Sequence, residues 1–585
     1  MLGRLRPYLL ALLVVAAATV PYARTLDFKF AWDDGFLIGP QLDVHGPGDL
    51  ARLWNLPFDN LLKDEVMART YFRPATLYSL ALDRALHGSN PRGFHLTNIV
   101  LYAGVCLFLW LLAWEISGRP IAAAIGAVLF ALHPTHPESV AFISGRTDVI
   151  AGLFLFAAFW VAARFGPAIE DARWKLLPAA LVLVPGLLAK EVALFGAPLL
   201  VLALAVRERG LGVRRLAIAA LPVAAVSVLY LAIRFAVLAS NPMPAVTPVE
   251  GTVAQVLTSV AVVARYLPLL FAPLRLSARH EIVEVHRPDL VFAAGLAALA
   301  AMAVGCWVLI RKRSPWSLPL ALFAATLVPI CYVRLLSGAI VAERFLFVPS
   351  GAIALAVALL PGVLPRRAAA ASHRSAAPRD AGAAFALVAG AIAVGLASLL
   401  GPRVAVWEDD GVLFRSMLRD SPESPHIHAI VGGWYYREHD YERSAFHYRR
   451  AIRYAPERAG ELLFHLGAAE YDMGAIDSAF VHVRAMNALR PDFGQGWFAL
   501  GNLYLKVNQP DSAMAAYRKA LQFSPNFAQA ENNIGAILER AGKYEEALAA
   551  YRRAVAALPG FADAQNNLRR LSAEMGRPEG LDSTP

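Results

Sequence analysis

Long apolar runs are the feature that most constrains how this chain can fold. A helix needs about 20 apolar residues to cross the hydrocarbon core of a bilayer. Before about Leu400, the sequence predicts eleven such crossings, and a twelfth apolar run lies at 254–274. The eleven crossings are predicted at residues 7–24, 94–116, 120–133, 148–165, 175–189, 191–206, 215–238, 290–310, 318–336, 340–360 and 381–400.

The composition agrees with a membrane protein. Of the 585 residues, 57% are hydrophobic and 17% are charged, whereas globular proteins average about 45–50% and about 25%. This excludes a wholly soluble enzyme, a disordered chain and a collagen-like protein. The net charge of +10 comes from short basic clusters between apolar runs, which is typical of membrane loops and not of nucleic-acid binding. Cys106, Cys306 and Cys331 all lie in apolar runs, so we expect no disulfide framework.

Basic residues in short loops predict the orientation, because such loops stay in the cytoplasm. Arg4 and Arg6 place the N-terminus inside, and the first run has no cleavage site, so we expect a retained anchor. The basic turns at 207–215 and 311–313 both face the cytoplasm if 254–274 is re-entrant, within an extracytoplasmic loop at 239–289. The first loop, 25–93, and the C-terminal region then lie outside. In a bacterial inner membrane that side is the periplasm.

Internal repeats dominate the rest of the chain. A unit with tetratricopeptide spacing is followed 34 residues later by a second, and two weaker copies precede them. We therefore predict a linker over 401–424, four repeats over 425–561, a capping helix over 562–576 and a disordered tail over 577–585. The whole chain is predicted to be all-α, with a membrane helix bundle over 1–400 followed by an α-solenoid. The positions of the clearest unit are Trp497, Leu500, Gly501, Tyr504, Ala513, Tyr517, Ala520 and Pro525.

Polar groups at the outer ends of the spans predict a site, because charges there are costly unless paired or used. The first group is Asp33-Asp34 in the string FAWDD. Adjacent carboxylates raise one another's pKa, so one can act as a general base while its neighbour orients a hydroxyl or a metal. The alternative is an Asx turn or a helix N-cap.

The second group is the string HPTHPE, residues 133–138, followed by Arg146 and Asp148. His133, His136 and Glu138 are metal-ligand types, but two prolines prevent helical spacing of the histidines. We favour hydrogen bonding to a phosphate or a sugar, with the Arg146 fork for anionic oxygens.

Two neighbouring charge pairs complete the outer groups. Lys190-Glu191 lies at a tight turn between two spans, where a snorkelling helix end is the alternative. Glu343-Arg344 precedes an apolar stretch, and an interfacial arginine there suits a lipid-linked phosphate. Its alternative is an internal ion pair that holds two helices together.

The order of these motifs resembles the transmembrane and tetratricopeptide-repeat O-mannosyltransferase family, which has the GT-C fold. The motifs are Asp-Asp after the first span, then HPTHPESVAFISGRTD, LLAKE and AERFLFVPS, and finally the repeats. The strings YFRP at 71–74 and FHLTN at 94–98 also look family-like. An Ala- and Arg-rich composition is typical of a bacterial relative.

The resemblance implies an inverting glycosyltransferase. Such an enzyme moves a sugar, mannose in the relatives, from a polyprenyl phosphate to Ser or Thr hydroxyls of an extracytoplasmic protein, which the repeats would bind. By the same resemblance Asp33 is the general base, Asp34 helps to place the acceptor or holds the base, and Trp32 and Arg73 lie on the acceptor side. Lys190 and Arg344 would neutralise the lipid phosphate. The remaining donor-side residues are His133, His136, Glu138, Arg146, Asp148, Glu191 and Glu343.

Other functions stay open from sequence alone. A membrane scaffold would use the repeats to recruit partners and the spans only as an anchor. A lipid-linked glycan ligase or polymerase would use the same donor with a glycan acceptor. A transporter is disfavoured, because the polar motifs gather at one face and no interrupted helix pair is evident. No cofactor is certain, and a divalent metal is one option.

Overall fold

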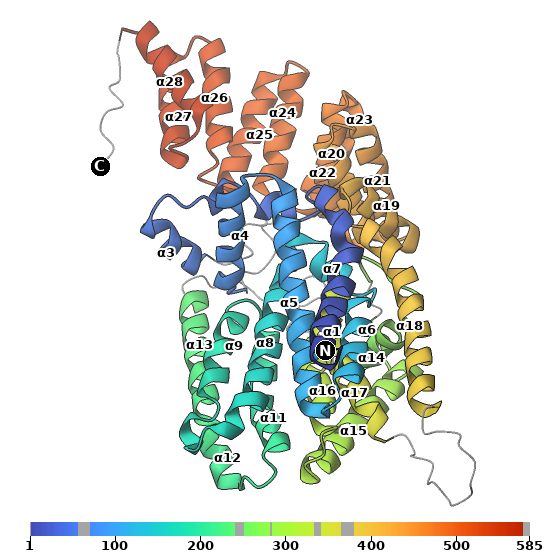
Figure 1. Cartoon of the computed structure of the whole chain (residues 1–585). Helices are drawn as coiled ribbons and strands as arrows, with labels where there is room; N and C mark the ends of the chain where they lie inside the picture. Colours follow the sequence, from blue (N-terminus) through green and yellow to red (C-terminus); the bar gives the residue numbers. More distant parts are fainter. Residues whose placement is uncertain are drawn as a thin grey trace, which may run out of the picture. The chain divides into compact units, whose positions relative to one another are not determined.

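The computed structural model describes residues 2–56, 71–239, 251–280, 284–332, 341–363 and 380–576. Within these ranges the chain is helical and has no strand, only an antiparallel bridge between His280 and Val341. It forms two compact units, Met1–Ser416 and Met417–Pro585 (Figure 1). The predicted all-α fold, a membrane helix bundle followed by a solenoid of helical repeats, is confirmed.

The first unit is a bundle of apolar helices. Each of the eleven predicted spans falls on one or two of them. The spans correspond to α1 (Leu2–Thr19), α5 (Pro91–Ser117), α6 (Pro120–Ala131), α8 (Arg146–Phe165), α9 (Leu177–Leu187), α10 (Val192–Gly196) with α11 (Leu199–Arg207), α12 (Val213–Ala219) with α13 (Leu221–Ala239), α15 (Leu290–Arg311), α16 (Ser317–Leu327), α17 (Phe347–Leu359) and α18 (Asp380–Ala405).

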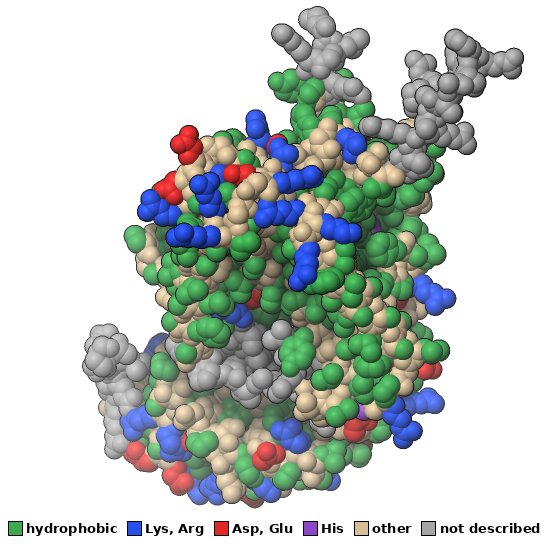
Figure 2. Space-filling view, turned by 90° about the horizontal axis from the view of Figure 1, so that it is seen from below, with side chains coloured by type: hydrophobic (Ala, Val, Ile, Leu, Met, Phe, Trp, Pro, Cys, Tyr) green, Lys and Arg blue, Asp and Glu red, His purple; other side chains and the backbone are tan. Residues whose placement is uncertain are grey.

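Several of these helices have the length and the surface of membrane spans. Among the described residues, eight helical segments are long and apolar enough to cross a bilayer, and three shorter apolar ones accompany them. Only 11% of the apolar window is buried in α15 and in α18. Their outward side chains include Leu290 and Leu387, which are 88% and 74% exposed, and hydrophobic side chains cover much of the face in Figure 2. Apolar surface of this kind is stable in lipid, so the chain is an integral membrane protein.

The two predicted basic turns meet at one end of the bundle. Arg313, just after α15, donates to the carbonyl of Leu211 at 3.0 Å and to the carbonyl of Arg209. Lys175 lies 3.0 Å from Glu208 in the same region. Lys and Arg side chains gather on the face shown in Figure 2. The turns at 207–215 and 311–313 therefore share one side, as their charge predicts, and which side that is stays a prediction.

The run at 254–274 forms α14 (Thr252–Phe271). The Thr258 hydroxyl accepts the N–H of Val285 at 2.9 Å, and His133 contacts the carbonyl of Leu270 at 3.0 Å. Residues 240–250 and 281–283 of the predicted loop at 239–289 lie outside the described residues, as do residues 57–70 of the first loop. Re-entry of α14 stays a prediction.

The second unit contains paired helices. The glycines of the two clearest repeats lie against the ring of a tyrosine on the next helix: a Cβ on Gly501 would be 2.4 Å from Tyr517, and one on Gly535 would be 2.6 Å from Tyr551. The close helix crossing therefore requires glycine. The pairs are α20 (Pro425–Arg437) and α21 (Tyr441–Tyr454), α22 (Ala459–Asp472) and α23 (Ile476–Leu489), α24 (Gly494–Lys506) and α25 (Pro510–Phe523), α26 (Ala528–Arg540) and α27 (Tyr544–Ala557), followed by α28 (Ala562–Glu574).

The segment at 401–424, predicted to be a linker, is mostly helical. The last span continues to Ala405, and α19 covers Asp410–Asp420. The boundary between the two compact units, Ser416/Met417, falls within this segment, and its role as a linker stays a prediction. Residues 577–585, predicted as a disordered tail, lie outside the described residues.

Candidate functional site

The turn that carries the two acidic residues has an unusual backbone. Trp32 has a φ of 52°, in the left-handed region that costs an L-residue about 1–2 kcal/mol. The carbonyl of Asp33 accepts the N–H groups of Phe36 (3.1 Å) and Leu37 (2.9 Å), so that helix α2, Asp34–Leu37, begins there. Because strained turns persist only where their surroundings hold them, this turn is a candidate functional feature.

The two carboxylates differ in their surroundings. Asp34 is fully buried, and its Oδ1 accepts both the N–H (2.8 Å) and the hydroxyl (2.7 Å) of Ser144. Its Oδ2 accepts the N–H of Ile143 at 3.2 Å. Burial raises the pKa of Asp34 from 3.8 to about 7, against the opposing effect of these hydrogen bonds. Asp33 is only partly buried. Asp34 thus fastens the turn to residues 143–144, and Asp33 is the more accessible carboxylate.

The loop that Asp34 contacts is tightly folded. A Cβ on Gly145 would lie 2.2 Å from the carbonyl oxygen of Glu138 and 2.8 Å from the Cα of Ser139. The short helix α7, Pro137–Val140, therefore packs directly on the start of α8. This explains the glycine of the GRTD string, because any side chain there would push the loop apart.

The two histidines of this loop hydrogen bond inside the protein. His133 contacts the Leu270 carbonyl through Nε2 and the Thr135 hydroxyl through Nδ1, at 3.0 and 2.8 Å. His136 contacts the Tyr102 hydroxyl (2.8 Å) and Ser350 Oγ (2.9 Å). Both rings are buried, and their contacts hold the loop.

The described residues offer no ligand set for a metal. Within the described ranges, no group of three or more His, Cys, Asp or Glu side chains is placed to hold an ion. Both nitrogens of His133 and of His136 are already engaged. These histidines therefore do not fit a metal site built from protein ligands alone.

Arg146 is fully buried and makes five polar contacts within the bundle. Its guanidinium donates to Asn98 Oδ1 (2.6 Å), to the carbonyl and hydroxyl of Ser79 (3.3 and 3.0 Å) and to the Phe94 carbonyl (2.8 Å). Its Nη2 also lies 2.6 Å from Asp83 Oδ2. The expected phosphate contact is therefore disfavoured, and Arg146 ties α4 (Pro74–His87), α5 and α8 together.

Lys190 lies among other charged groups. Its ammonium is 2.6 Å from Asp148 Oδ1 and 4.9 Å from the centre of the Phe345 ring. Burial lowers its pKa to about 8; Asp148 opposes this shift, and the nearby charges of Arg73 and Arg344 add to it. Three cations are thus close enough to repel one another, an arrangement that an anion would relieve.

The acidic neighbours of Lys190 and Arg344 in the sequence pair with distant residues. Glu191 lies 3.5 Å from Arg73 and 2.7 Å from Arg234 on α13. Glu343, in contrast, accepts two hydrogen bonds from Arg403 at the end of α18, at 3.0 and 3.2 Å. Sequence reasoning missed Arg234 and Arg403, because single arginines inside apolar runs give no local signal of their partners.

Arg344 pairs with the loop that Asp34 fastens. Its backbone N–H donates to Glu138 Oε2 at 3.0 Å, and its Nε lies 3.7 Å from Oε1. Burial raises the pKa of Glu138, and Arg344 opposes that shift. Glu138 belongs to the same short loop as Ser144, so this loop connects the turn at Asp33 with Arg344 and the cations near it.

The cationic cluster consists of Arg73, Lys190, Arg234 and Arg344. The three acids that face it leave one positive charge in excess. Its arginine side chains keep 12–27% exposure; among the acids, Asp148 and Glu138 are each 3% exposed and Glu191 is 24% exposed. Three arginines and one acid are thus accessible, and this excess of positive charge suits an anionic oxygen. The three acids are Glu138, Asp148 and Glu191.

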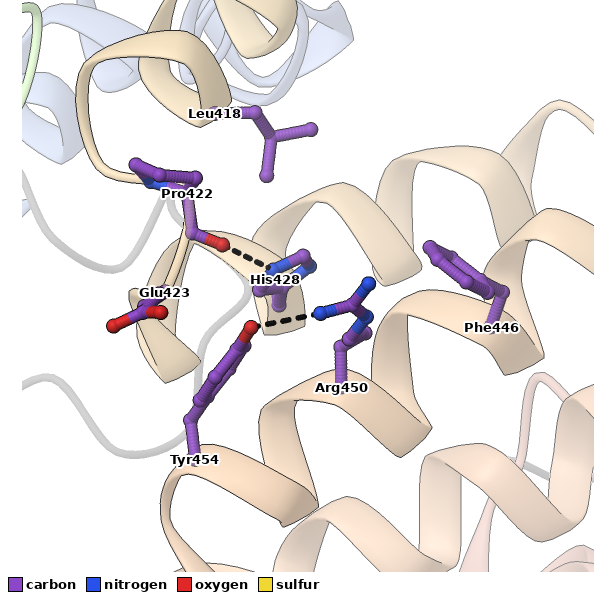
Figure 3. A pocket seen from close by; sticks show the side chains of 7 residues that line it. All are labelled: Leu418, Pro422, Glu423, His428, Phe446, Arg450 and Tyr454. Carbon is purple, nitrogen blue, oxygen red and sulfur yellow. Dashed lines mark hydrogen bonds between the residues drawn. The ribbon is translucent and has the colours of Figure 1, made fainter.

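The repeat unit has a pocket of about 320 Å³ at its first helix pair (Figure 3). Arg450 donates to the Tyr454 hydroxyl at 2.8 Å, and its guanidinium lies 5.5 Å from the Phe446 ring centre. His428 contacts the Pro422 carbonyl at 3.0 Å. An arginine held by a neutral hydroxyl and a ring can still pair with a carboxylate. The lining residues are Leu418, Pro422, Glu423, His428, Phe446, Arg450 and Tyr454.

Comparison with known proteins agrees with the predicted repeats. A family model described as tetratricopeptide repeat matches residues 498–562. The chain is 31% identical over 169 residues to Protein O-mannosyl-transferase TMTC4 of Homo sapiens, covering 26% of this chain and 23% of that protein.

Two further relatives show the same extent of similarity. Protein O-mannosyl-transferase TMTC1 of Mus musculus is 36% identical over 155 residues, which cover 26% of this chain and 16% of the relative. For TMTC3 of Homo sapiens the identity is 29% over 148 residues, with 25% and 16% covered. The chain thus spans less than a quarter of the length of these relatives. The resemblance to the transmembrane and tetratricopeptide-repeat O-mannosyltransferases that the motifs predicted is confirmed by these matches.

Proposed function

We propose that this protein is a membrane glycosyltransferase. It would move a sugar, mannose by analogy with the names of its relatives, from a polyprenyl phosphate to a Ser or Thr hydroxyl of a protein. The observation that supports this best is the loop at 138–145, which contacts both the Asp33 turn through Asp34 and the cationic cluster through Arg344. A base and a phosphate site are thus held by one element.

The reaction needs only a few groups. Asp33 takes the proton from the acceptor hydroxyl, and the oxygen attacks the anomeric carbon of the sugar. The bond from that carbon to the phosphate oxygen breaks, and the electron pair leaves with the polyprenyl phosphate. Attack opposite the leaving group inverts the configuration. Arg344 and Lys190 compensate the negative charge that develops on the phosphate.

Asp34 has a supporting role in this proposal. Its oxygens are engaged by Ser144 and Ile143, so it holds the turn and leaves Asp33 to the acceptor. Trp32 precedes Asp33 and, with Arg73, belongs on the acceptor side. His133 and His136 would act through the loop they stabilise, and Glu138, Asp148, Glu191 and Glu343 through the cations they orient. Arg146 would act only through the fold.

The repeats would bind the acceptor protein. Arrays of this kind present extended surfaces for peptides, and the Arg450 pocket would take an acidic side chain. We place the protein in a bacterial inner membrane, with its N-terminus in the cytoplasm and its repeats in the periplasm. Glu423 and Arg450 in this pocket would then meet secreted proteins.

The test is transfer of a labelled sugar by the purified, full-length protein. Mannosyl polyprenyl phosphate and a Ser/Thr-rich peptide are the probes, and the product is identified by mass spectrometry. Asp33→Asn is expected to reduce transfer at least 100-fold, which corresponds to the usual contribution of a positioned base. Asp27→Asn, on an exposed carboxylate six residues earlier, is the matched control.

Each outcome separates the proposal from an alternative. Unchanged transfer by Asp33→Asn would remove the base assignment. Label found on glycan and not on the peptide would indicate a ligase or polymerase. No transfer from any lipid-linked sugar, with the peptide still bound, would favour a scaffold.

A further inference from the structure

The backbone conformation that presents Asp33 needs a holding contact. Trp32 lies in the left-handed region, which non-glycine residues rarely adopt without support. Its N–H donates to Asp410 Oδ1 at 2.6 Å. A hydrogen bond to a carboxylate is among the stronger ones, and this one acts on the strained residue itself. The two partners are 378 positions apart in the sequence.

Other contacts bring the same two segments together. Lys29 donates its N–H to the carbonyl of Glu408 at 3.0 Å. The Trp32 ring stacks on Phe142 with ring centres 6.3 Å apart, and Phe142 also stacks on Trp407 at 4.9 Å. Residues 407–410 thus contact residues 29–32 through a backbone and a carboxylate hydrogen bond, and both segments stack on Phe142.

The end of the last span is itself fixed within the site. Arg403 is 7% exposed and binds the fully buried Glu343, the neighbour of Arg344. Segment 403–410 therefore contacts the base turn at one end and the region of the cationic cluster at the other. All these residues belong to the first compact unit.

We propose that Asp410 is a positioning residue, which holds the left-handed turn at Trp32 so that Asp33 faces the acceptor. This inference rests on the proposed function, since it concerns the conformation of the same base. It makes the segment after the last span a part of the active site and not only a connection to the repeats.

Three variants of the full-length protein test the role. Asp410→Ala removes the acceptor of the Trp32 N–H, so kcat is expected to fall at least tenfold while KM for the lipid donor stays unchanged. Asp410→Asn keeps an acceptor oxygen and is expected to stay within threefold of wild type. Asp409→Ala is the control: its Oδ1 caps the same helix at the N–H of Val412 (2.9 Å) but does not contact the turn.

A second measurement keeps the test decisive if Asp410→Ala accumulates poorly. Glycine adopts the left-handed region freely, so the effect of Asp410→Ala on kcat should shrink below threefold in a Trp32→Gly background. Equal kcat for Asp410→Ala and Asp409→Ala, or an Asp410→Asn as slow as Asp410→Ala, would overturn the inference. Absence of transfer by wild type would instead refute the proposed function.

Discussion

Asp34 gives the site a pH dependence that can be measured on folding. Burial raises its pKa from 3.8 to about 7, so the folded protein binds this proton more tightly than the unfolded chain. The stabilisation is complete below about pH 3.8 and is lost as the pH rises through about 7. The Tm of wild type should therefore fall relative to that of Asp34→Asn between pH 5 and pH 8. A constant Tm difference in detergent over this range would contradict the assignment.

The proposed role of Arg344 in binding the donor phosphate can be tested by a single substitution. Arg344→Gln should lower kcat/KM for the lipid donor about 10- to 100-fold, the usual effect of losing a charged hydrogen bond. Because Arg344→Gln leaves the buried Glu138 without the opposing charge of the guanidinium, the double variant Arg344→Gln with Glu138→Gln should recover Tm but not activity.

The control for Arg344 is an arginine on the exposed surface. Arg173→Gln removes an exposed arginine that pairs only locally with Asp171 and should change neither quantity. If donor kinetics are unchanged in Arg344→Gln, Arg344 is a structural residue like Arg146.

At the scale of elements, the repeats depend on close helix crossing. A Cβ at position 501 would overlap the ring of Tyr517, and such overpacking costs about 1–3 kcal/mol. Gly501→Ala should therefore lower the Tm of the repeat unit by several degrees. Gly560→Ala, where a Cβ meets no atom within 4 Å, should not. Equal Tm values for the two variants, measured by calorimetry, would show that the two helices can move apart to accommodate the added methyl group.

At the scale of the molecule, the basic turns predict which side each loop faces. In a background with Ala at the three native cysteines, Gly210→Cys should be shielded in intact cells from a membrane-impermeant maleimide. Gly48→Cys and Gly560→Cys should be labelled. All three glycines have open space around Cβ, so differences report the membrane side and not packing. Labelling of Gly210→Cys would reverse the predicted orientation.

The features that the sequence predicts well are periodic or local. Apolar length predicts the spans, and the 34-residue spacing of small and aromatic residues predicts the repeats. The polar groups at the span ends were also predicted to gather at one membrane face. The structure brings Lys190 to Asp148 and Arg344 to Glu138, and the membrane face on which these pairs lie stays a prediction.

The partners of these groups could not be predicted. Lys190 and Glu191 are adjacent, yet each pairs with a residue from another helix. Arginine is a residue type that often binds anions, but Arg146 is buried and pairs with Asp83 and Asn98. Its role therefore depends on burial, which its residue type does not reveal. The sequence did not identify Asp410 as a site residue, because helix α19 begins where hydropathy suggests a linker.

The long separation of Trp32 and Asp410 has a consequence for biosynthesis. At about 5–20 residues per second, the ribosome needs roughly 20 to 75 seconds to cover the 378 positions that separate Asp410 from Trp32. During that interval the turn at Trp32 lacks the contact from Asp410 that holds its shape. Under the proposed function, a chain arrested before its last span is made would therefore lack a formed base turn.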